Sequence, residues 1–291
     1  MFDPEFNPAP LVSIIITYYA QEQFIEQTVL SAKSQTYKNI EVIIVDDGSS
    51  KPVWPLIAHI DGIRVFRKNN EGCPAARNFG FRESGGQFLV FLDQDDLLQP
   101  DAVEAQMRAF NQDHRAVLSF GATRLIDANG EEIRKPHTCR RRKNYLLMLL
   151  ESNPIECVGG AMIRRSAFLN VGLFDESFAD IGQSDDYDLY LRLAELGPFV
   201  RHTHWVVDYR QHSQNVSRDK ERMLAGTMYA LDKVERNSNL PDTQRRRVSY
   251  GRKRWHHTFR PKKDLAYKIK GLYFNFRAMM TVPLSELVRI R

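Results

Sequence analysis

Cysteine is scarce in this chain of 291 residues, which contains Cys73, Cys139 and Cys157. The number is odd, and no C-x-x-C pair is present. A disulfide framework or a zinc site of the usual spacing is therefore not expected, and a reducing cytosol is the default compartment.

Long apolar runs are missing as well. No run approaches the ~20 residues that a helix needs to cross a bilayer. The opening residues, "MFDPEFNPAPL", contain acids but no Lys or Arg, unlike a secretory signal. We therefore expect a cytoplasmic protein that meets a membrane only peripherally, at its inner face.

Two common nucleotide-binding fingerprints are also absent. No G-x-G-x-x-G follows the first apolar run, and the chain has no Walker A loop. These absences argue against an NAD site of the usual kind and against ATP bound in a P-loop.

The net charge of +5 conceals an uneven distribution. Residues 236–291 hold 15 basic and 3 acidic side chains, whereas residues 1–235 hold 26 basic and 33 acidic ones. An acidic body with a basic tail indicates two roles. We expect one domain over residues 1–215 and a basic, mainly helical C-terminal extension over residues 216–291.

The apolar pattern predicts an α/β protein. Apolar runs rich in β-branched residues occur at 11–17, 40–46, 63–66, 88–93 and 116–120, and helical segments occur at 22–35, 73–84 and 99–113. This alternation is typical of a mostly parallel central sheet flanked by helices. Further along, we expect a strand and a short helix within 158–176, an amphipathic helix over 184–197 and a short strand over 204–210.

Polar side chains gather where the predicted strands end. In an open α/β sheet, ligands bind beyond the carboxyl ends of the strands. The residues expected at that edge are a threonine, a tyrosine and five acids: Thr17, Tyr18, Asp46, Asp47, Asp93, Asp95 and Asp96.

Three of these acids follow the fourth strand in "FLVFLDQDD". Like charges this close repel one another, so Asp93, Asp95 and Asp96 favour a bound cation. Mg²⁺ and Mn²⁺ prefer such oxygen ligands and leave positions for substrate phosphates. The alternative is an acidic turn that caps the next helix.

The second strand and the segment "NEGCPAARNFG" indicate a nucleotide. An acid at the end of the second strand of an α/β sheet commonly binds a ribose. Arg77, in a helix after a loop, provides a planar guanidinium suited to a base or a diphosphate.

Six ordered blocks make the chain resemble the inverting family 2 glycosyltransferases with the GT-A fold. They are "VSIIITYYAQEQFIEQTVLSAKSQTYKNIEVIIVDDGSS", "NEGCPAARNFG", "FLDQDD", "GLFDESF", "SDDYDLYLR" and "YRQHSQNVS", and they cover about residues 10–215. The resemblance implies a nucleotide-diphosphate-sugar donor, an Mn²⁺ or Mg²⁺ ion, and a glycan or lipid-linked acceptor. It also implies a role in cell-surface polysaccharide or lipopolysaccharide biosynthesis.

The resemblance assigns the donor-binding positions. Thr17, either Asp46 or Asp47, and Arg77 hold the nucleobase and ribose, and we place Tyr18 in the same site. Asp93 contacts the ribose or the metal.

The remaining roles concern the metal and the proton. Asp95 is implied as the principal metal ligand, with Asp96 near the donor sugar or the metal. His212 lies where many members place a histidine near the metal or the diphosphate. Asp186 corresponds to the general base, whereas Asp185 stands where the family usually has Glu, so the choice between the two acids stays open. A structural alternative is a charge pair stabilised by the dipole of its helix.

These groups suit glycosyl transfer. A divalent ion stabilises the charge on the departing diphosphate, and a carboxylate takes the proton of the acceptor hydroxyl, an effect of about 10²–10⁴-fold. A nucleotidyltransferase is an alternative, but it would carry a glycine-rich basic loop after the first strand, where this chain reads "TYYAQEQ". A non-catalytic nucleotide-binding scaffold is the other alternative.

The basic tail, "RRRVSYGRKRWHHTFRPKKDLAYKIKGLYFNFRAMM" over 245–280, mixes Lys and Arg with aromatic residues. It is compatible with a solvated helical face, a nucleic-acid site or an anionic membrane surface. A lipid-linked acceptor favours the membrane, so we expect no nucleic-acid partner.

Overall fold

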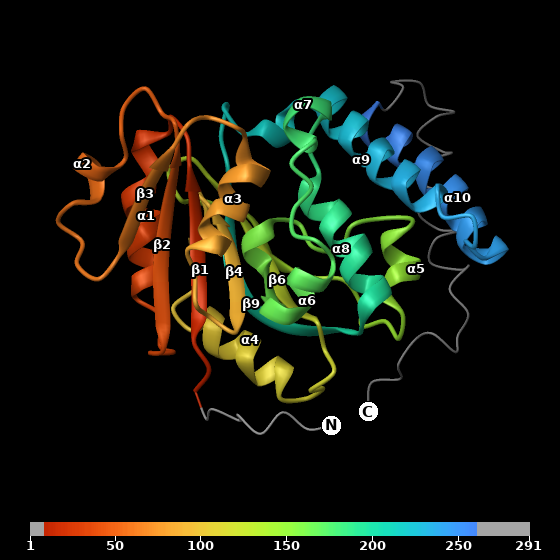
Figure 1. The fold of residues 1–291 in the computed structure, drawn as a ribbon, viewed down its shortest axis with the longest axis horizontal. Coiled ribbons are helices and arrows are strands. Elements are labelled where there is room, and N and C mark those ends of the chain that lie inside the picture. The colour runs from red at the N-terminus through yellow and green to blue at the C-terminus, as the bar shows by residue number, and fades with distance from the viewer. Residues whose placement is uncertain (1–8, 261–291) are drawn as a thin grey trace. The chain divides into compact units, whose positions relative to one another are not determined.

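A computed structural model describes residues 9–260 of the chain (Figure 1). These residues divide into two compact units. The sheet unit comprises the described residues up to Thr138 together with Ile155–Glu176 and Leu196–His212. The helical unit comprises Cys139–Pro154, Ser177–Glu195 and the described residues from Ser213 on.

The sheet unit is built on a nine-stranded mixed sheet with the order β3-β2-β1-β4-β8-β6-β9-β5, and β7 pairs with β6. Strands β3, β2, β1 and β4 are parallel neighbours, and β6 and β9 are parallel, while β8, β5 and β7 run antiparallel to their partners. The strands are β1 (Val12–Tyr18), β2 (Ile40–Asp47), β3 (Arg64–Lys68), β4 (Phe88–Asp93), β5 (Leu97–Leu98), β6 (Leu118–Asp127), β7 (Glu132–His137), β8 (Ala161–Arg164) and β9 (Phe199–Gln211).

Helices cover both faces of this sheet, which explains why the sequences of its central strands are almost entirely apolar. All seven residues of β1 are buried. Ile14 and Ile16 join the core beneath α1 and α4, whereas Ile15 faces α3 on the other side. The helices of this unit are α1 (Glu22–Lys33), α2 (Trp54–Ile57), α3 (Cys73–Arg82), α4 (Ala102–Phe110) and α6 (Arg165–Asn170), with a 3₁₀ turn, η1, at Val158–Gly160.

The helical unit contains the expected amphipathic helix except for its last residues, and the described residues from Ser213 on. Its elements are α5 (Tyr145–Leu149), α7 (Phe178–Ile181), α8 (Asp185–Leu196, of which the last residue belongs to the sheet unit), the 3₁₀ turn η2 (Val216–Arg218), α9 (Lys220–Glu235) and α10 (Asp242–Phe259). Within residues 9–260, no helix combines the length and the apolar character of a membrane span.

The predicted α/β class with a mostly parallel sheet is confirmed, and α9 and α10 lie where the helical extension was expected. The boundary after residue 215 stays a prediction, and the part of the tail from residue 261 on lies outside the described residues. Four strands differ from expectation. The predicted strand at 116–120 begins at Leu118 and continues to Asp127, β5 and β7 were not anticipated, and β9 begins at Phe199. The early part of β9 pairs with β6, where Leu118 lies beside Phe199. The local sequence "FVRHTH" gives no sign of a strand here, because the pairing depends on a distant segment.

Candidate active site at the carboxyl edge of the sheet

The strand register brings the predicted edge residues together. Thr17 lies beside Val45 of β2 and beside Asp93 of β4, and Tyr18 lies beside Asp46. Because these strands are parallel neighbours, their polar ends share one edge, as the sequence predicts.

Asp95 and His212 meet at this edge although 117 residues separate them in the chain. The Asp95 Oδ2 atom lies 2.7 Å from His212 Nε2, and the two side chains are 11% and 4% exposed. The imidazole also packs on Phe24 of α1, with 4.9 Å between ring centroids. The contact between Asp95 and His212 therefore joins the loop after β4 to the residue that follows β9.

The acids of this edge are crowded. Burial, and secondarily the charge of Asp93, raises the pKa of the Asp95 carboxyl. Burial and the charges of Asp95 and Asp93 raise the pKa of Asp96 well above its ordinary value. Asp96 Oδ1 accepts the backbone N–H of Arg210 at 2.9 Å, while Oδ2 is buried without a hydrogen-bond partner among the described residues. This negative cluster is one that a cation would stabilise.

Asp93 is the more open of these acids and is held by an arginine. Arg77 of α3 donates through its Nη2 to Asp93 Oδ1 at 2.6 Å, and its guanidinium carbon lies 5.2 Å from the centroid of the Phe174 ring. Arg77 is buried, and the Asp93 side chain is 36% exposed. A planar cation and a carboxylate thus lie together at the predicted donor site.

The donor set fits a divalent ion in part. Two ligands bound at right angles to an Mg²⁺-sized ion lie roughly 3 Å apart, given metal–oxygen distances of about 2.1 Å. The 2.7 Å between Asp95 Oδ2 and His212 Nε2 is a hydrogen-bond distance and is slightly shorter than that value, so an ion would take the place of the proton that the two atoms share. Among residues 9–260, no three acids, histidines or cysteines form a ready-made metal cluster. Asp95 and His212, with Asp93 near Asp95, therefore suit a cation whose remaining ligands are waters and substrate phosphates.

The two acids that end β2 are engaged in holding loops. Asp46 is 1% exposed and accepts the backbone N–H groups of Ser49 at 2.8 Å and Val53 at 3.0 Å. Asp47 accepts from Lys68 Nζ at 3.0 Å, and also from the backbone N–H groups of Glu71 and Gly72. These bonds fix the loops that flank the predicted nucleotide site, and direct nucleoside contact by either acid stays a prediction.

The end of β1 contributes two hydroxyl groups. Thr17 Oγ1 lies 3.6 Å from Cys73 Sγ at the start of α3. The Tyr18 hydroxyl is buried without a hydrogen-bond partner among the described residues, and burial, then Glu22 and Asp46, raises its pKa. Their predicted contacts with a donor remain predictions.

The predicted base lies in the other unit. Asp185 and Asp186 occupy the first turn of α8, where Asp185 is buried and Asp186 is partly buried. Asp186 Oδ1 accepts the backbone N–H of Tyr187 at 2.7 Å. Asp188 is 2% exposed and forms ion pairs with Arg192 and Lys233, each at 2.7 Å, so it has a structural role.

Sequence reasoning missed Arg210, which holds the backbone of the acidic loop after β4. Its Nε donates to the Asp95 carbonyl at 2.9 Å, and its guanidinium carbon lies 4.6 Å from the centroid of the Phe24 ring. The side chain is 2% exposed. The available signal was a charged residue inside the apolar strand text "WVVDYRQ".

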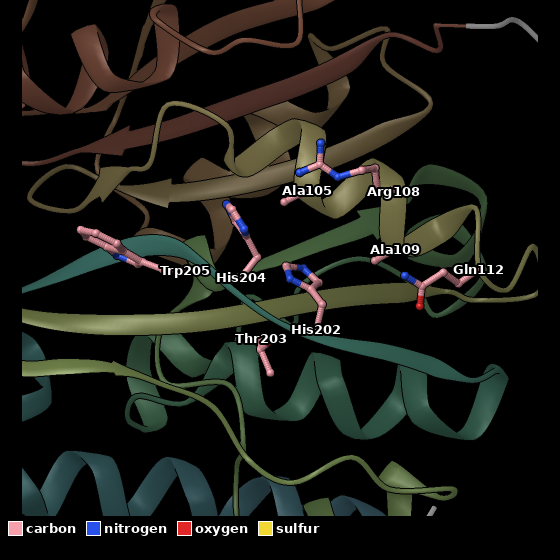
Figure 2. Close-up of a pocket in the computed structure, with 8 residues that line it drawn as sticks. All are labelled: Ala105, Arg108, Ala109, Gln112, His202, Thr203, His204 and Trp205. Carbon is pink, nitrogen blue, oxygen red and sulfur yellow. The ribbon is translucent and has the colours of Figure 1, made fainter. Parts of the chain in front are cut away.

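A separate groove of about 560 Å³ lies between α4 and β9 (Figure 2). His202 and His204 point from β9 toward α4, where His202 Nε2 lies 3.1 Å from Gln106 Oε1 and His204 Nε2 lies 2.9 Å from Asp101 Oδ2. Burial, and then the neighbouring cations, lowers the pKa of His202 to about 4. The predicted site residues do not line this groove, so it is not the predicted active site.

Comparison with known families identifies the fold and the class. The family model described as glycosyl transferase family 2 matches residues 13–172, more than half of the chain. The chain belongs to glycosyl transferase family 2. The predicted family and enzyme class are thereby confirmed.

Several curated relatives belong to bacteria. The Escherichia coli protein named UDP-Glc:alpha-D-GlcNAc-diphosphoundecaprenol beta-1,3-glucosyltransferase WfaP is 32% identical over 228 residues, which cover 74% of this chain and 82% of that protein. An uncharacterized glycosyltransferase of Rickettsia felis is 31% identical over 218 residues, 72% of this chain and 35% of the relative. This chain thus spans about a third of the length of that longer relative.

Solved structures share the fold at low sequence identity. S. aureus TarS 1-349 in complex with UDP-GlcNAc has a TM-score of 0.65 at 14% identity, covering 94% of this chain and 81% of that one. The mannosyltransferase PcManGT from Pyrobaculum calidifontis, in complex with GDP-Man and Mn²⁺, has a TM-score of 0.64 at 16% identity, covering 97% and 78%. These neighbours confirm the expected GT-A type of fold.

Proposed function

We propose that this protein is a metal-dependent inverting glycosyltransferase that moves a sugar from a nucleotide-diphosphate sugar to an acceptor hydroxyl. The observation that carries the proposal is the meeting of Asp95 and His212 beside Asp93 at the carboxyl edge of the sheet. A carboxylate and an imidazole in direct contact, within a crowded negative cluster, favour a divalent ion and a phosphate-bearing donor.

Each side chain of the edge has a part in this reaction. Asp95, His212 and Asp93 would hold Mn²⁺ or Mg²⁺, and the ion would stabilise the charge on the departing diphosphate. Arg77 positions Asp93 and lies within reach of the donor's nucleoside side, together with Thr17 and Tyr18. Asp96, whose Oδ2 has no hydrogen-bond partner within residues 9–260, would lie near the donor sugar or the metal.

Asp186 accepts the proton of the attacking hydroxyl in this proposal. It is a partly buried carboxylate in the first turn of α8. A base on the face opposite the leaving group gives inversion at the anomeric carbon. Asp185, its neighbour, is more buried and is the second candidate for this role.

Relatives support the type of donor and the setting. The names of similar proteins mention UDP-glucose, a diphosphoundecaprenol acceptor, UDP-GlcNAc, and GDP-mannose with Mn²⁺. By analogy, we propose a role in the assembly of a cell-surface polysaccharide or lipopolysaccharide, on a glycan or lipid-linked acceptor.

A membrane-facing role for α10 extends this proposal. Arg246 and Lys253 are exposed on this helix. Each basic residue near an anionic surface adds about 1 kcal/mol of attraction. Flotation with anionic vesicles should therefore exceed flotation with neutral ones, and Arg246→Glu with Lys253→Glu should reduce it. Equal flotation with both kinds of vesicle would reject a charge-driven contact.

The test of the main proposal needs no known acceptor. A panel of UDP- and GDP-sugars is incubated with the protein and Mn²⁺, and the release of nucleoside diphosphate is followed. We expect release from at least one donor, loss of release with EDTA, and loss with Asp95→Asn. Release that persists with EDTA would contradict metal dependence, and tight donor binding without turnover on any acceptor would indicate a scaffold.

A further inference from the structure

The turn that leads into α8 has an unusual backbone. Ser184, the residue before Asp185, has φ at 89°, in the left-handed region that side-chain-bearing residues rarely adopt. Such a conformation persists only where the surroundings enforce it, and it occurs often at functional sites. Within the helical unit, the enforcing element is α9.

The backbone of α9 lies directly against this turn. The Gln183 N–H donates to the Arg222 carbonyl at 3.1 Å. A Cβ atom on Gly226 would overlap the Gln183 carbonyl oxygen, and a Cβ on Gly182 would lie 2.6 Å from the Arg222 oxygen. Only a helix with glycine at position 226 can approach the turn this closely.

A hydrogen-bonded chain continues the contact. Thr227 Oγ1 donates to the Met223 carbonyl at 2.8 Å, so its oxygen remains available to accept from Ser184 Oγ at 3.2 Å. The Ser184 carbonyl in turn accepts the Asp188 N–H at 3.1 Å, within the first turn of α8. Lys233 of α9 pairs with the Asp188 carboxylate. The first turn of α8 is thus tied to α9 through backbone, hydroxyl and charge.

We propose that Gly226 and Thr227 are positioning residues for the catalytic base: α9 fixes the Gly182–Ser184 turn and thereby the direction of the Asp186 carboxylate. This inference rests on the proposed function, because it assigns proton acceptance to Asp186. A general base must lie within hydrogen-bond reach of the hydroxyl that it deprotonates. A displacement of about 1 Å in such a group can lower the rate about 10²-fold.

The chain offers a matched steric control. Gly251 of α10 lies in the same unit, and a Cβ there would overlap the Leu150 carbonyl oxygen. Gly251→Ala therefore introduces a similar backbone clash against Leu150, the residue after α5, rather than against the turn. The neighbouring Leu149 carbonyl accepts the Tyr187 hydroxyl of α8, so this control is linked to α8 through that side chain. Thr227→Val and Thr227→Ser form a second pair, in which only the serine keeps the hydroxyl.

The experiment measures kcat for donor hydrolysis, with the sugar nucleotide that the wild-type protein hydrolyses fastest, and the Kd of the matching nucleoside diphosphate with Mn²⁺. We expect Gly226→Ala to lower kcat about 10²-fold with an unchanged Kd. Thr227→Val should lower kcat about 5-fold, which corresponds to the free energy of one hydrogen bond. Thr227→Ser keeps the hydroxyl and should have the kcat of the wild-type protein. Gly251→Ala should lower kcat at least about 10-fold less than Gly226→Ala does, at a temperature where it is folded.

Several results would overturn the inference. They are an equal loss of kcat in Gly226→Ala and Gly251→Ala, a loss that comes with a weaker Kd, or full kcat in Gly226→Ala. If Gly226→Ala does not fold, the threonine pair decides: Thr227→Val at wild-type kcat, or a Thr227→Ser variant that does not recover, would overturn it. Asp186→Asn distinguishes a failure of the proposed function from a failure of the positioning role. Full activity in Asp186→Asn contradicts the assignment of Asp186 as the base. An inactive Asp186→Asn together with a fully active Gly226→Ala contradicts only the positioning role of α9.

Discussion

The protein contains two groups of three aspartates, and the two groups differ in how their negative charges are surrounded. At the sheet edge, Asp93, Asp95 and Asp96 follow β4, and burial with mutual repulsion raises the pKa of Asp95 and Asp96. At the start of α8, Asp185, Asp186 and Asp188 lie in the first turn of a helix.

The second group is compensated by its own unit. Asp188 forms ion pairs with Arg192 and Lys233, and the helix dipole favours negative charge in a first turn. At the sheet edge, Arg77 pairs with Asp93, but Asp96 keeps a buried oxygen without a partner among the described residues. The difference is consistent with the proposal that the edge group receives a cation, whereas the charge of Asp188 in the helix group is already paired.

The largest effect should follow from removing the base. Asp186→Asn keeps the size of the side chain but cannot accept the proton, so kcat should fall about 10²–10⁴-fold. The Kd for Mn²⁺ and for the nucleoside diphosphate should not change. Steady-state kinetics together with calorimetry checks this, and Asp188→Asn should instead show mainly a loss of stability. A weaker affinity for Mn²⁺ in Asp186→Asn would contradict the assignment of metal binding and proton transfer to different groups.

Next in size is the loss of the nitrogen ligand at the edge. His212→Gln should raise the Mn²⁺ concentration for half-maximal rate about 10–100-fold, since even outer partners of metal ligands have effects of this size. His202→Gln, in the groove of Figure 2, is the matched control and should leave this concentration unchanged. Identical Mn²⁺ titrations of the wild-type protein and the His212 variant would remove His212 from the site.

Compensation at the helix group can be weakened directly. Lys233→Met leaves the buried Asp188 carboxylate with Arg192 as its remaining ion-pair partner among the described residues. Because Lys233 is 25% exposed, the loss of stability should be moderate, about 1–2 kcal/mol. Lys253→Met, at an exposed position of α10, should change stability by less than about 0.5 kcal/mol. Urea unfolding measures both values, and equal effects would show that the Lys233 pair contributes no more than a surface charge.

The smallest effect is a gain in stability at the edge. The pKa of Asp96 is raised in the folded protein, so its contribution to stability is full below the ordinary pKa of aspartate and is lost as the pH rises through the raised value. Asp96→Asn removes this loss. Without metal, the variant should be more stable than wild type at neutral pH, by about 1 kcal/mol, and the gain should vanish toward pH 3. Thermal unfolding over pH 3–8 tests this, and a variant less stable at neutral pH would contradict it.

Local patterns revealed the central strands and the edge residues, because apolar runs and the polar residues that end them are written in single segments. Asp95 and His212 were assigned to one site by resemblance, and the structure brings them within 2.7 Å. What the sequence did not reveal depends on distant pairing. The support from Arg210, the bonds of Asp47 to Glu71 and Gly72, and the tie between Gly226 and the Gly182–Ser184 turn arise from segments far apart in the chain, where no local period marks the contact.

The central claim is that the acids after β4 bind a divalent cation that holds the donor's diphosphate. Titration of Mn²⁺ into the wild-type protein and into Asp95→Asn, each with and without UDP or GDP and followed by electron paramagnetic resonance, tests it most directly. The account predicts one bound Mn²⁺ per wild-type chain, tighter when the matching nucleoside diphosphate is present, and no such coupling in Asp95→Asn. Equal Mn²⁺ binding by both proteins, unaffected by either nucleotide, would contradict it.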